Sequence, residues 1–304
     1  MFTHTRAWLL VSTCAVTGLA HAEKIDQRLA VQPRGTVEIS NVSGRIDVSG
    51  WDNPEVEVQG EIGGGVQKLD FSTDHGHTII KVRVLNGYVH GSGSADLRIR
   101  VPRDSELDIS AVSADVGIAD VEGELMAKNV SGNVKADVFG HDAEIKTVSG
   151  DVVLRGRGKE GANGAEIHIS TISGNIRVDR AGGDVEATTV SGDVNLKLEP
   201  SRSVRLRSTS GDLGFEGKLV KGASVDAETV SGDLTVRAGH EGPLDYQVST
   251  FSGDIKNCMG VESERVSKYG PGRRLNGSRG EGNGDEARVR LKTMSGDVEL
   301  CDKT

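Results

Sequence analysis

The sequence is poor in aromatic residues, in cysteine and in long apolar runs. Only 3% of its 304 residues are aromatic, and only 3 are cysteine. No segment approaches the roughly 20 consecutive apolar residues that a membrane-spanning helix needs, so no membrane span is predicted. Acidic residues outnumber basic ones, 45 to 36, which gives a net charge of −9. Such a chain repels phosphate backbones, so no nucleic-acid partner is expected.

Glycine is abundant by contrast, together with valine, isoleucine and threonine. The chain contains 41 glycines, many of them next to short stretches of alternating apolar and polar residues. This composition is typical of strands joined by tight turns and differs from that of long helices, which are rich in leucine, alanine and lysine. We therefore predict an all-β protein.

Residues 1–22 have the three-part layout of a secretory signal peptide. Arg6 provides a basic start, residues 7–16 are apolar, and small residues end the segment at Ala22. We expect cleavage after Ala22 and an exported protein, either periplasmic or on the cell surface. Cys14 faintly resembles the cysteine of a lipoprotein cleavage box, which leaves lipidation as an alternative.

One short motif returns along the chain: an apolar residue or Thr, then Ser-Gly-Asp or Ser-Gly-Asn, then Val, Leu or Ile. Successive copies lie 18, 18, 24, 18, 19, 21, 21 and 43 residues apart. Self-similarity at about 20 residues is typical of a solenoid, whose units bury their apolar faces only by stacking. The motif serines are Ser113, Ser131, Ser149, Ser173, Ser191, Ser210, Ser231, Ser252 and Ser295, with a possible outlier at Ser43.

The flanks of the motif show how one coil is formed. Before Ser191 the odd-numbered residues are apolar or small, as at Val185 and Ala187, whereas after it the even-numbered ones are, as at Val194 and Leu196. Strict alternation predicts a half-buried strand, and a change of phase at glycine predicts a corner. We therefore predict a narrow parallel β-solenoid (β-helix) of about 18–21-residue coils, with two short strands in each coil.

Stacking such coils would align equivalent residues into columns. One column, two residues before the motif serine, would be an inward ladder of hydroxyls that bond the neighbouring coil or the corner backbone. A second would be a column of corner carboxylates, which either cap their own turns or bind Ca²⁺. The ladder comprises Thr147, Thr171, Thr189, Ser208, Thr229, Thr250 and Thr293; the corner column comprises Asp151, Asp193, Asp212, Asp233, Asp254 and Asp297, with Asn133 and Asn175 interleaved.

The period predicts the domain organisation. Residues 23–110 keep β-type alternation but lose the period, so we expect an N-terminal β cap that shields the edge of the first coil. Residues 111–304 form the predicted solenoid. Two loop insertions are expected to leave it, at 155–164 and 259–286, and long loops in a regular scaffold often carry recognition.

Cys258 and Cys301 form the sharpest local prediction. Each lies six residues after a motif serine, at an outward position. Equivalent positions in adjacent layers are about 4.8 Å apart, which a disulfide can span in an oxidising compartment. We predict a Cys258–Cys301 disulfide that clamps the C-terminal coil, provided that residues 259–286 add no further layer.

Three stretches resemble the bacterial "putative adhesin" family of exported proteins. They are the repeated Val-Ser-Gly-Asp-Val, the segment from Val42 to Val48 that is followed by Gly50-Trp51-Asp52, and the strand from Leu97 to Pro102. The resemblance covers about residues 30–300. It implies a β-solenoid in the cell envelope or outside the cell, and it implies no particular functional residue.

No catalytic, cofactor-binding or metal-binding residue is assigned. Asp74, His75, His77 and His90 would be a conceivable metal cluster, but nothing in their spacing fixes a geometry. The favoured hypothesis is a non-catalytic envelope scaffold or adhesin that binds a protein or glycan. A polysaccharide-active β-helix enzyme is the first alternative, although aromatics to line a sugar cleft are few. A periplasmic stress-sensing or signalling accessory protein is the second.

Overall fold

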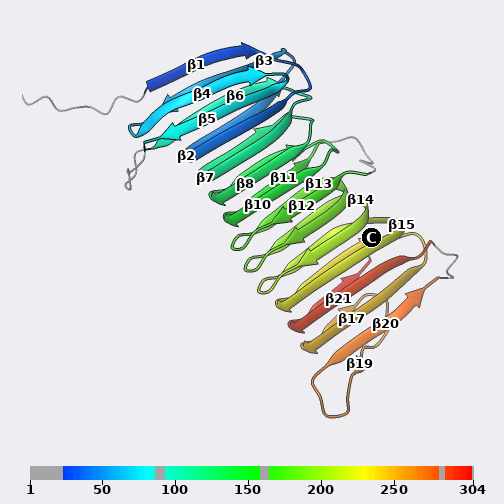
Figure 1. Cartoon of the computed structure of the whole chain (residues 1–304). Coiled ribbons are helices and arrows are strands. Elements are labelled where there is room, and N and C mark those ends of the chain that lie inside the picture. The colour runs from blue at the N-terminus through cyan, green and yellow to red at the C-terminus, as the bar shows by residue number, and fades with distance from the viewer. Residues whose placement is uncertain (1–22, 86–92, 158–163, 281–284, 303–304) are drawn as a thin grey trace, which may run out of the picture.

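The protein is built of β-strands throughout the part of the chain that the structure describes. This computed structural model describes residues 23–85, 93–157, 164–280 and 285–302, so the expected signal peptide, residues 1–22, lies outside it. The strands stack into one elongated body (Figure 1). The all-β prediction is confirmed, and within these ranges there is no helix of the length and apolarity that crossing a membrane requires.

The middle of the body is a stack of parallel coils. We call the sheet formed by strands before the motif serines the lead-in sheet, and the sheet formed by strands after them the lead-out sheet. Motif serines of successive coils are register partners, as Ser131 is with Ser149 and Ser191 with Ser210. The strands here are β7 (Glu106–Ala119), β8 (Leu125–Ser131), β9 (Val134–Val138), β10 (Ala143–Ser149), β11 (Val152–Gly156), β12 (Glu166–Ser170), β13 (Ile176–Thr188), β14 (Val194–Arg207), β15 (Leu213–Ser231) and β16 (Leu234–Gly239).

A single apolar core runs between the two sheets. The alternation around Ser191 places side chains as predicted: Val185 and Ala187 are buried on one side of the corner, and Val194 and Leu196 on the other. Each coil therefore buries one row of side chains from each sheet against the same rows of its neighbours. Because no coil encloses a complete core alone, the fold depends on contacts between layers.

The corner glycine allows the layers to approach one another closely. Gly192 has a φ of +146°, and a Cβ atom built on it would lie 2.1 Å from the carbonyl oxygen of Gly174 in the preceding coil. A side chain would therefore strain the backbone and collide with the layer below. This geometry explains why glycine follows the motif serine.

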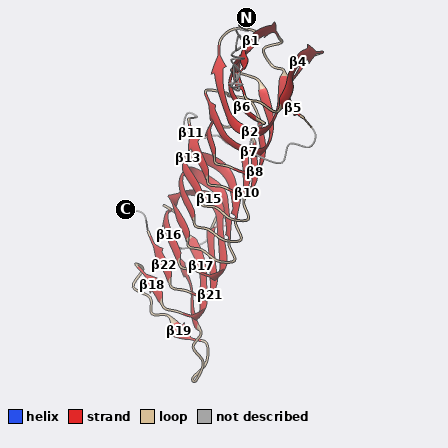
Figure 2. Cartoon of the chain, turned by 90° about the vertical axis from the view of Figure 1, so that its left-hand side faces the viewer, coloured by secondary structure: helices blue, strands red, loops and turns tan. Residues whose placement is uncertain are grey.

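At the C-terminal end, the coils are not stacked in chain order. Strand β21 (Ala287–Ser295) pairs with β15 on one side and with β17 (Leu244–Ser252) on the other, and β22 (Val298–Cys301) likewise lies between β16 and β18 (Ile255–Asn257) (Figures 1 and 2). The coil of Ser295 thus lies between those of Ser231 and Ser252. We expected it as the last layer, and the structure places it one layer earlier.

The segment between these coils explains the inverted order. Residues 259–286, expected to loop away, contain β19 (Glu264–Arg265) and β20 (Arg273–Arg279). Strand β20 pairs antiparallel with β17 and covers its outer edge, so the last part of the chain occupies the layer on the inner edge of β17. The other expected insertion, 155–164, begins within β11, and residues 158–163 lie outside the described part of the chain.

The N-terminal end is also closed by antiparallel strands, and the stack begins earlier than the period indicated. Strand β2 contains Ser43, which is in register with Ser113 of β7, so this outlying copy of the motif forms a coil. Strand β7 crosses the expected boundary at residue 110. The strands of this end are β1 (Glu23–Ala30), β2 (Thr36–Trp51), β3 (Glu55–Ile62), β4 (Val66–Asp74), β5 (His77–Val84) and β6 (Ser94–Pro102).

Candidate binding groove

The two cysteines singled out by the sequence form a disulfide. Cys258 follows β18 and Cys301 ends β22, and their Cα atoms are 4.8 Å apart. The backbone N–H of Cys258 donates to the carbonyl of Leu300 at 3.1 Å, as neighbouring parallel strands do. The bridge therefore joins two adjacent layers.

The corner carboxylates bond to the next coil and not to their own turn. Asp115 accepts the backbone N–H of Asn133 at 2.9 Å, and Asp233 accepts that of Asp297 at 2.7 Å. An asparagine oxygen does the same, because the Asn175 side chain accepts the N–H of Asp193 at 3.0 Å. Each oxygen thus joins one layer to the next, which accounts for both residue types without a metal ion. No group of three His, Cys, Asp or Glu side chains within the described ranges could hold one.

The inward hydroxyl column bonds the corner backbone at four places. Thr189, Thr229, Thr250 and Thr293 donate to the carbonyl oxygens of corner glycines in a neighbouring coil, at 2.9 to 3.5 Å. The other three hydroxyls, on Thr147, Thr171 and Ser208, have no partner in the described part of the chain. The column is therefore mainly structural.

The conceivable histidine cluster is not assembled in the structure. His75 contacts its neighbour Asp74, whereas His77 contacts Glu38 of β2 at 3.2 Å. His90 lies outside the described residues. These contacts are pairwise and offer no common centre for a metal.

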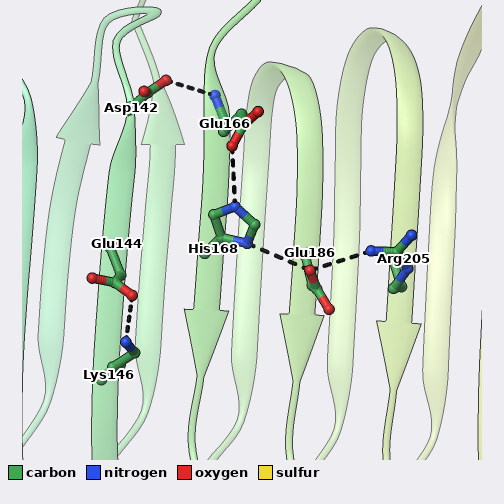
Figure 3. A network of polar contacts seen from close by, with 7 residues as sticks. All are labelled: Asp142, Glu144, Lys146, Glu166, His168, Glu186 and Arg205. Carbon is green, nitrogen blue, oxygen red and sulfur yellow. Dashed lines mark hydrogen bonds and ion pairs between the residues drawn. The ribbon is translucent and has the colours of Figure 1, made fainter.

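The outer face of the lead-in sheet bears a ladder of charged side chains. His168 lies 3.5 Å from Glu166 and 3.5 Å from Glu186, and Arg205 donates to Glu186 at 3.4 Å (Figure 3). Lys146 donates to Glu144 in the same strand, which lowers the pKa of that carboxyl. These pairs, some within a strand and some between neighbouring strands, are partly exposed and largely satisfy one another.

An apolar ridge runs beside the corners. The residue before each motif serine points outward, and Val112, Val130, Ile172 and Val190 are each about half exposed. Side chains of this column lie roughly 4.8 Å from their counterparts in the next layer, so they stabilise the stack as a ladder of neighbours.

The outer face of the lead-out sheet contains a groove of about 880 Å³ near the N-terminal end. Three small residues, Ser49, Gly117 and Ala119, form its floor. Neighbouring strands have long side chains at the same register, such as Arg100 beside Ser49 and Lys135 beside Gly117. Both coils contribute small residues at the same register, so the dent spans two layers. We call this the basic groove; the residues that line it are Asp47, Val48, Ser49, Glu57, Gln59, Arg98, Ile99, Arg100, Gly117, Ile118, Ala119, Lys135, Ala136, Asp137, Val153, Arg155, Arg157, Arg177 and Asp179.

The N-terminal cap forms one wall of the groove and holds its arginine in place. Arg100 lies 3.3 Å from the carboxylate of Glu57, which is only 1% exposed, and its guanidinium lies 5.6 Å from the ring centroid of Trp51. Gln59 donates to Glu57 at 3.2 Å, and Arg28 also contacts it. A buried carboxylate with these partners fixes the arginine, because leaving it unpaired would be costly.

The opposite wall belongs to the regular coils. Arg157 pairs with Asp137 at 3.1 Å and Arg177 with Asp179 at 3.1 Å. Arg98, Lys135 and Arg155 have no ion pair among the described residues. Six basic and four acidic side chains line the basic groove, so its sign is opposite to the net charge of −9.

Sequence reasoning did not find this groove. Arg98 and Arg100 belong to β6, which precedes β9 and β11 in the chain and contains none of the motif serines. Strand β6 joins the same sheet because it pairs with β2. The available signal was the replacement of long outward residues by Gly117 and Ala119 in the first regular coil. These small residues indicate a groove only when the strand order is known, because β6 lies next to β2, and β2 lies next to β7.

The fold defines the class: an all-β, solenoid-type protein of stacked parallel coils with antiparallel strands at both ends. The chain belongs to the Toastrack DUF4097 family, which matches residues 23–182, 160–221 and 188–301.

The chain also resembles several solved structures, all of them at low sequence identity. A "putative cell adhesion protein" from Clostridium sporogenes is 7% identical, with a TM-score of 0.24 and coverage of 92% of this chain and 100% of that one. A "putative lipid binding protein" and a "putative adhesin", both from Parabacteroides distasonis, are 10% and 12% identical with TM-scores of 0.31 and 0.30, each match covering 92% of this chain and 98% of the other. No significant match is found among curated proteins.

Proposed function

We propose that this protein is a non-catalytic, exported binding protein of the bacterial envelope, adhesin-like in role, and that it holds its partner in the basic groove. The basic groove itself is the observation that supports the proposal. It is a large concavity on an otherwise regular flank, and its charge is opposite to that of the whole chain.

The surroundings favour binding because they are rigid. Strands β3, β6, β2, β7, β9, β11 and β13 cross the basic groove and are hydrogen-bonded to one another in that order. Side chains that project from a continuous sheet lose little freedom when a ligand arrives. A preformed site on such a flank suits recognition of an extended partner.

Binding can be tested with one substitution that fills the basic groove. Gly117→Tyr places a ring on the floor, and a Cβ there meets only the carboxylate tip of Asp47, at 2.9 Å. We expect binding of the purified protein to isolated envelopes to fall about tenfold or more, because contacts over the floor are lost.

Gly214→Tyr is the matched control. Gly214 lies in the same outward column further along the stack, and the tightest contact of a Cβ there would be the side-chain oxygen of Asn195, at 2.8 Å. Envelope binding that both variants retain would refute the groove as the site.

Export can be tested separately. We expect the exported protein that binds the envelopes to begin at Glu23, and N-terminal sequencing of that protein checks it.

A further inference from the structure

We infer that the ligand of the basic groove is a linear acidic polysaccharide lying along the axis of the stack. The inference rests on the proposed function and names its ligand class. Three kinds of observation carry it: unpaired cations, the length of the groove, and the mixture of charges in its lining.

The cations are available to a ligand. Arg98, Lys135 and Arg155 line the basic groove, are exposed, and have no ion pair among the described residues. A guanidinium binds the two oxygens of a carboxylate or sulfate in parallel, and such charge-assisted hydrogen bonds are the strong ones. An anionic group placed here displaces only water.

The length of the basic groove suits an extended chain. It crosses seven strands, and six steps of about 4.8 Å make roughly 29 Å. Arg98 and Lys135 belong to the same register column, three steps apart on either side of the floor, or roughly 14 Å. A polymer with repeated acidic groups contacts both walls at once, whereas a small anion reaches only one.

The acidic residues of the lining distinguish a glycan from a simple polyanion. Asp47, Asp137 and Asp179 lie among the cations, and their carboxylates can accept hydrogen bonds from the hydroxyl groups of a ligand. An acidic sugar carries both hydroxyl donors and anionic groups, so it satisfies both kinds of side chain. A polyanion without hydroxyls meets the same repulsion from these carboxylates and offers them no hydroxyl donor in return.

Two competing polymers fit less well. Single-stranded nucleic acid gains affinity from aromatic stacking, and no aromatic side chain is among the lining residues of the basic groove. An acidic peptide gains affinity by pairing its backbone with a sheet edge, whereas this groove lies on the face of a sheet whose strands are already paired.

The test measures binding of the whole exported chain by calorimetry. The probes are a polygalacturonate fragment with carboxylates, a heparin fragment with sulfates, neutral dextran, single-stranded DNA and a poly-glutamate peptide. We expect one or both acidic glycans to bind and dextran not to bind, with affinity that falls as salt is raised. The carboxylate and sulfate arms identify which acid group is preferred.

Charge reversal localises the site. Lys135→Glu with Arg155→Glu should weaken glycan binding about tenfold or more, because two cations of one wall become anions. Lys256→Glu with Arg237→Glu is the matched control: these residues lie in the same two register columns beyond the basic groove and change the net charge equally. We expect less than about a twofold effect from the control.

Several outcomes would overturn the inference: no binding by either acidic glycan, equal loss in both double variants, or tighter binding of DNA or poly-glutamate. If neither acidic glycan binds but Gly117→Tyr still abolishes envelope binding, the ligand class is wrong and the proposed function stands. Absence of envelope binding as well would remove both.

Discussion

The middle of the stack and its C-terminal end use the same coil but assemble it differently. In the middle, each coil lies on the one before it in the chain, so layer order follows sequence order. At the C-terminal end, the coil of Ser295 lies between two coils that precede it in the chain, and β20 covers the outer edge of β17. The comparison teaches that identical motifs specify the shape of a layer without specifying its neighbours.

The largest effect should come from a corner in the middle of the stack. Gly192→Val puts a branched side chain at a φ of +146° and 2.1 Å from the Gly174 carbonyl oxygen. We expect a loss of stability of at least about 4 kcal/mol or failure to fold, because the layers must separate. Circular dichroism during urea unfolding measures it. Gly64→Ala is the control, since a Cβ at Gly64 meets nothing within 4 Å.

The next effect should be confined to the C-terminal end. Replacing both cysteines, Cys258→Ser with Cys301→Ser, opens a loop of sequence separation 43. We expect a loss of about 2–4 kcal/mol, since the bridge limits the freedom of the unfolded chain. Hydrogen exchange should speed up in β17, β18, β21 and β22 before it does so in β9 or β11. Uniform acceleration along the stack would show that the two regions unfold as one unit.

A smaller effect should follow from uncapping the carboxylate column. Asp254 has no further coil above it, and Arg273 of β20 contacts its carboxylate at 3.0 Å instead. Arg273→Ala should cost about 0.5–1 kcal/mol, because the pair is partly exposed. Arg177→Ala, which breaks the Asp179 pair within one strand, serves as the comparison. A loss no greater than that of the comparison variant would refute a capping role.

The smallest effect should depend on pH. Lys292 of the inserted coil donates to Glu228 of β15 at 2.7 Å and lowers the pKa of that carboxyl. The pair therefore adds stability that is present above the unfolded pKa, about 4.3, and is lost as the pH falls through the lower folded value. Lys292→Met should cost under about 0.5 kcal/mol at pH 7, since both side chains are about half exposed, and nothing at pH 2. Unfolding curves at the two pH values decide it.

Much of the fold could be predicted because its signals are local. The phase change at Ser191, the corner glycines and the spacing of Cys258 and Cys301 all concern residues that share a coil or occupy the same place in two coils. The roles of the corner carboxylates were half predicted: the residue type indicated a turn, but the bond to the next layer needed the layers in place. The basic groove could not be predicted, because its walls come from a cap strand and from coils that lie far from it in the chain.

The sequence by itself determined what each coil is: an alternation that buries one row of side chains, a glycine that lets corners stack, and cysteines placed to join two layers. Only the tertiary structure decided which coil lies on which, since every coil offers its neighbour the same hydrogen-bonding edge and the same apolar rows. That choice depends on how the antiparallel strands β1, β3 and β4 at one end and β20 at the other cover the open edges. The tertiary structure also decided the basic groove, because closing the N-terminal end places Arg98 and Arg100 opposite Lys135 and Arg155.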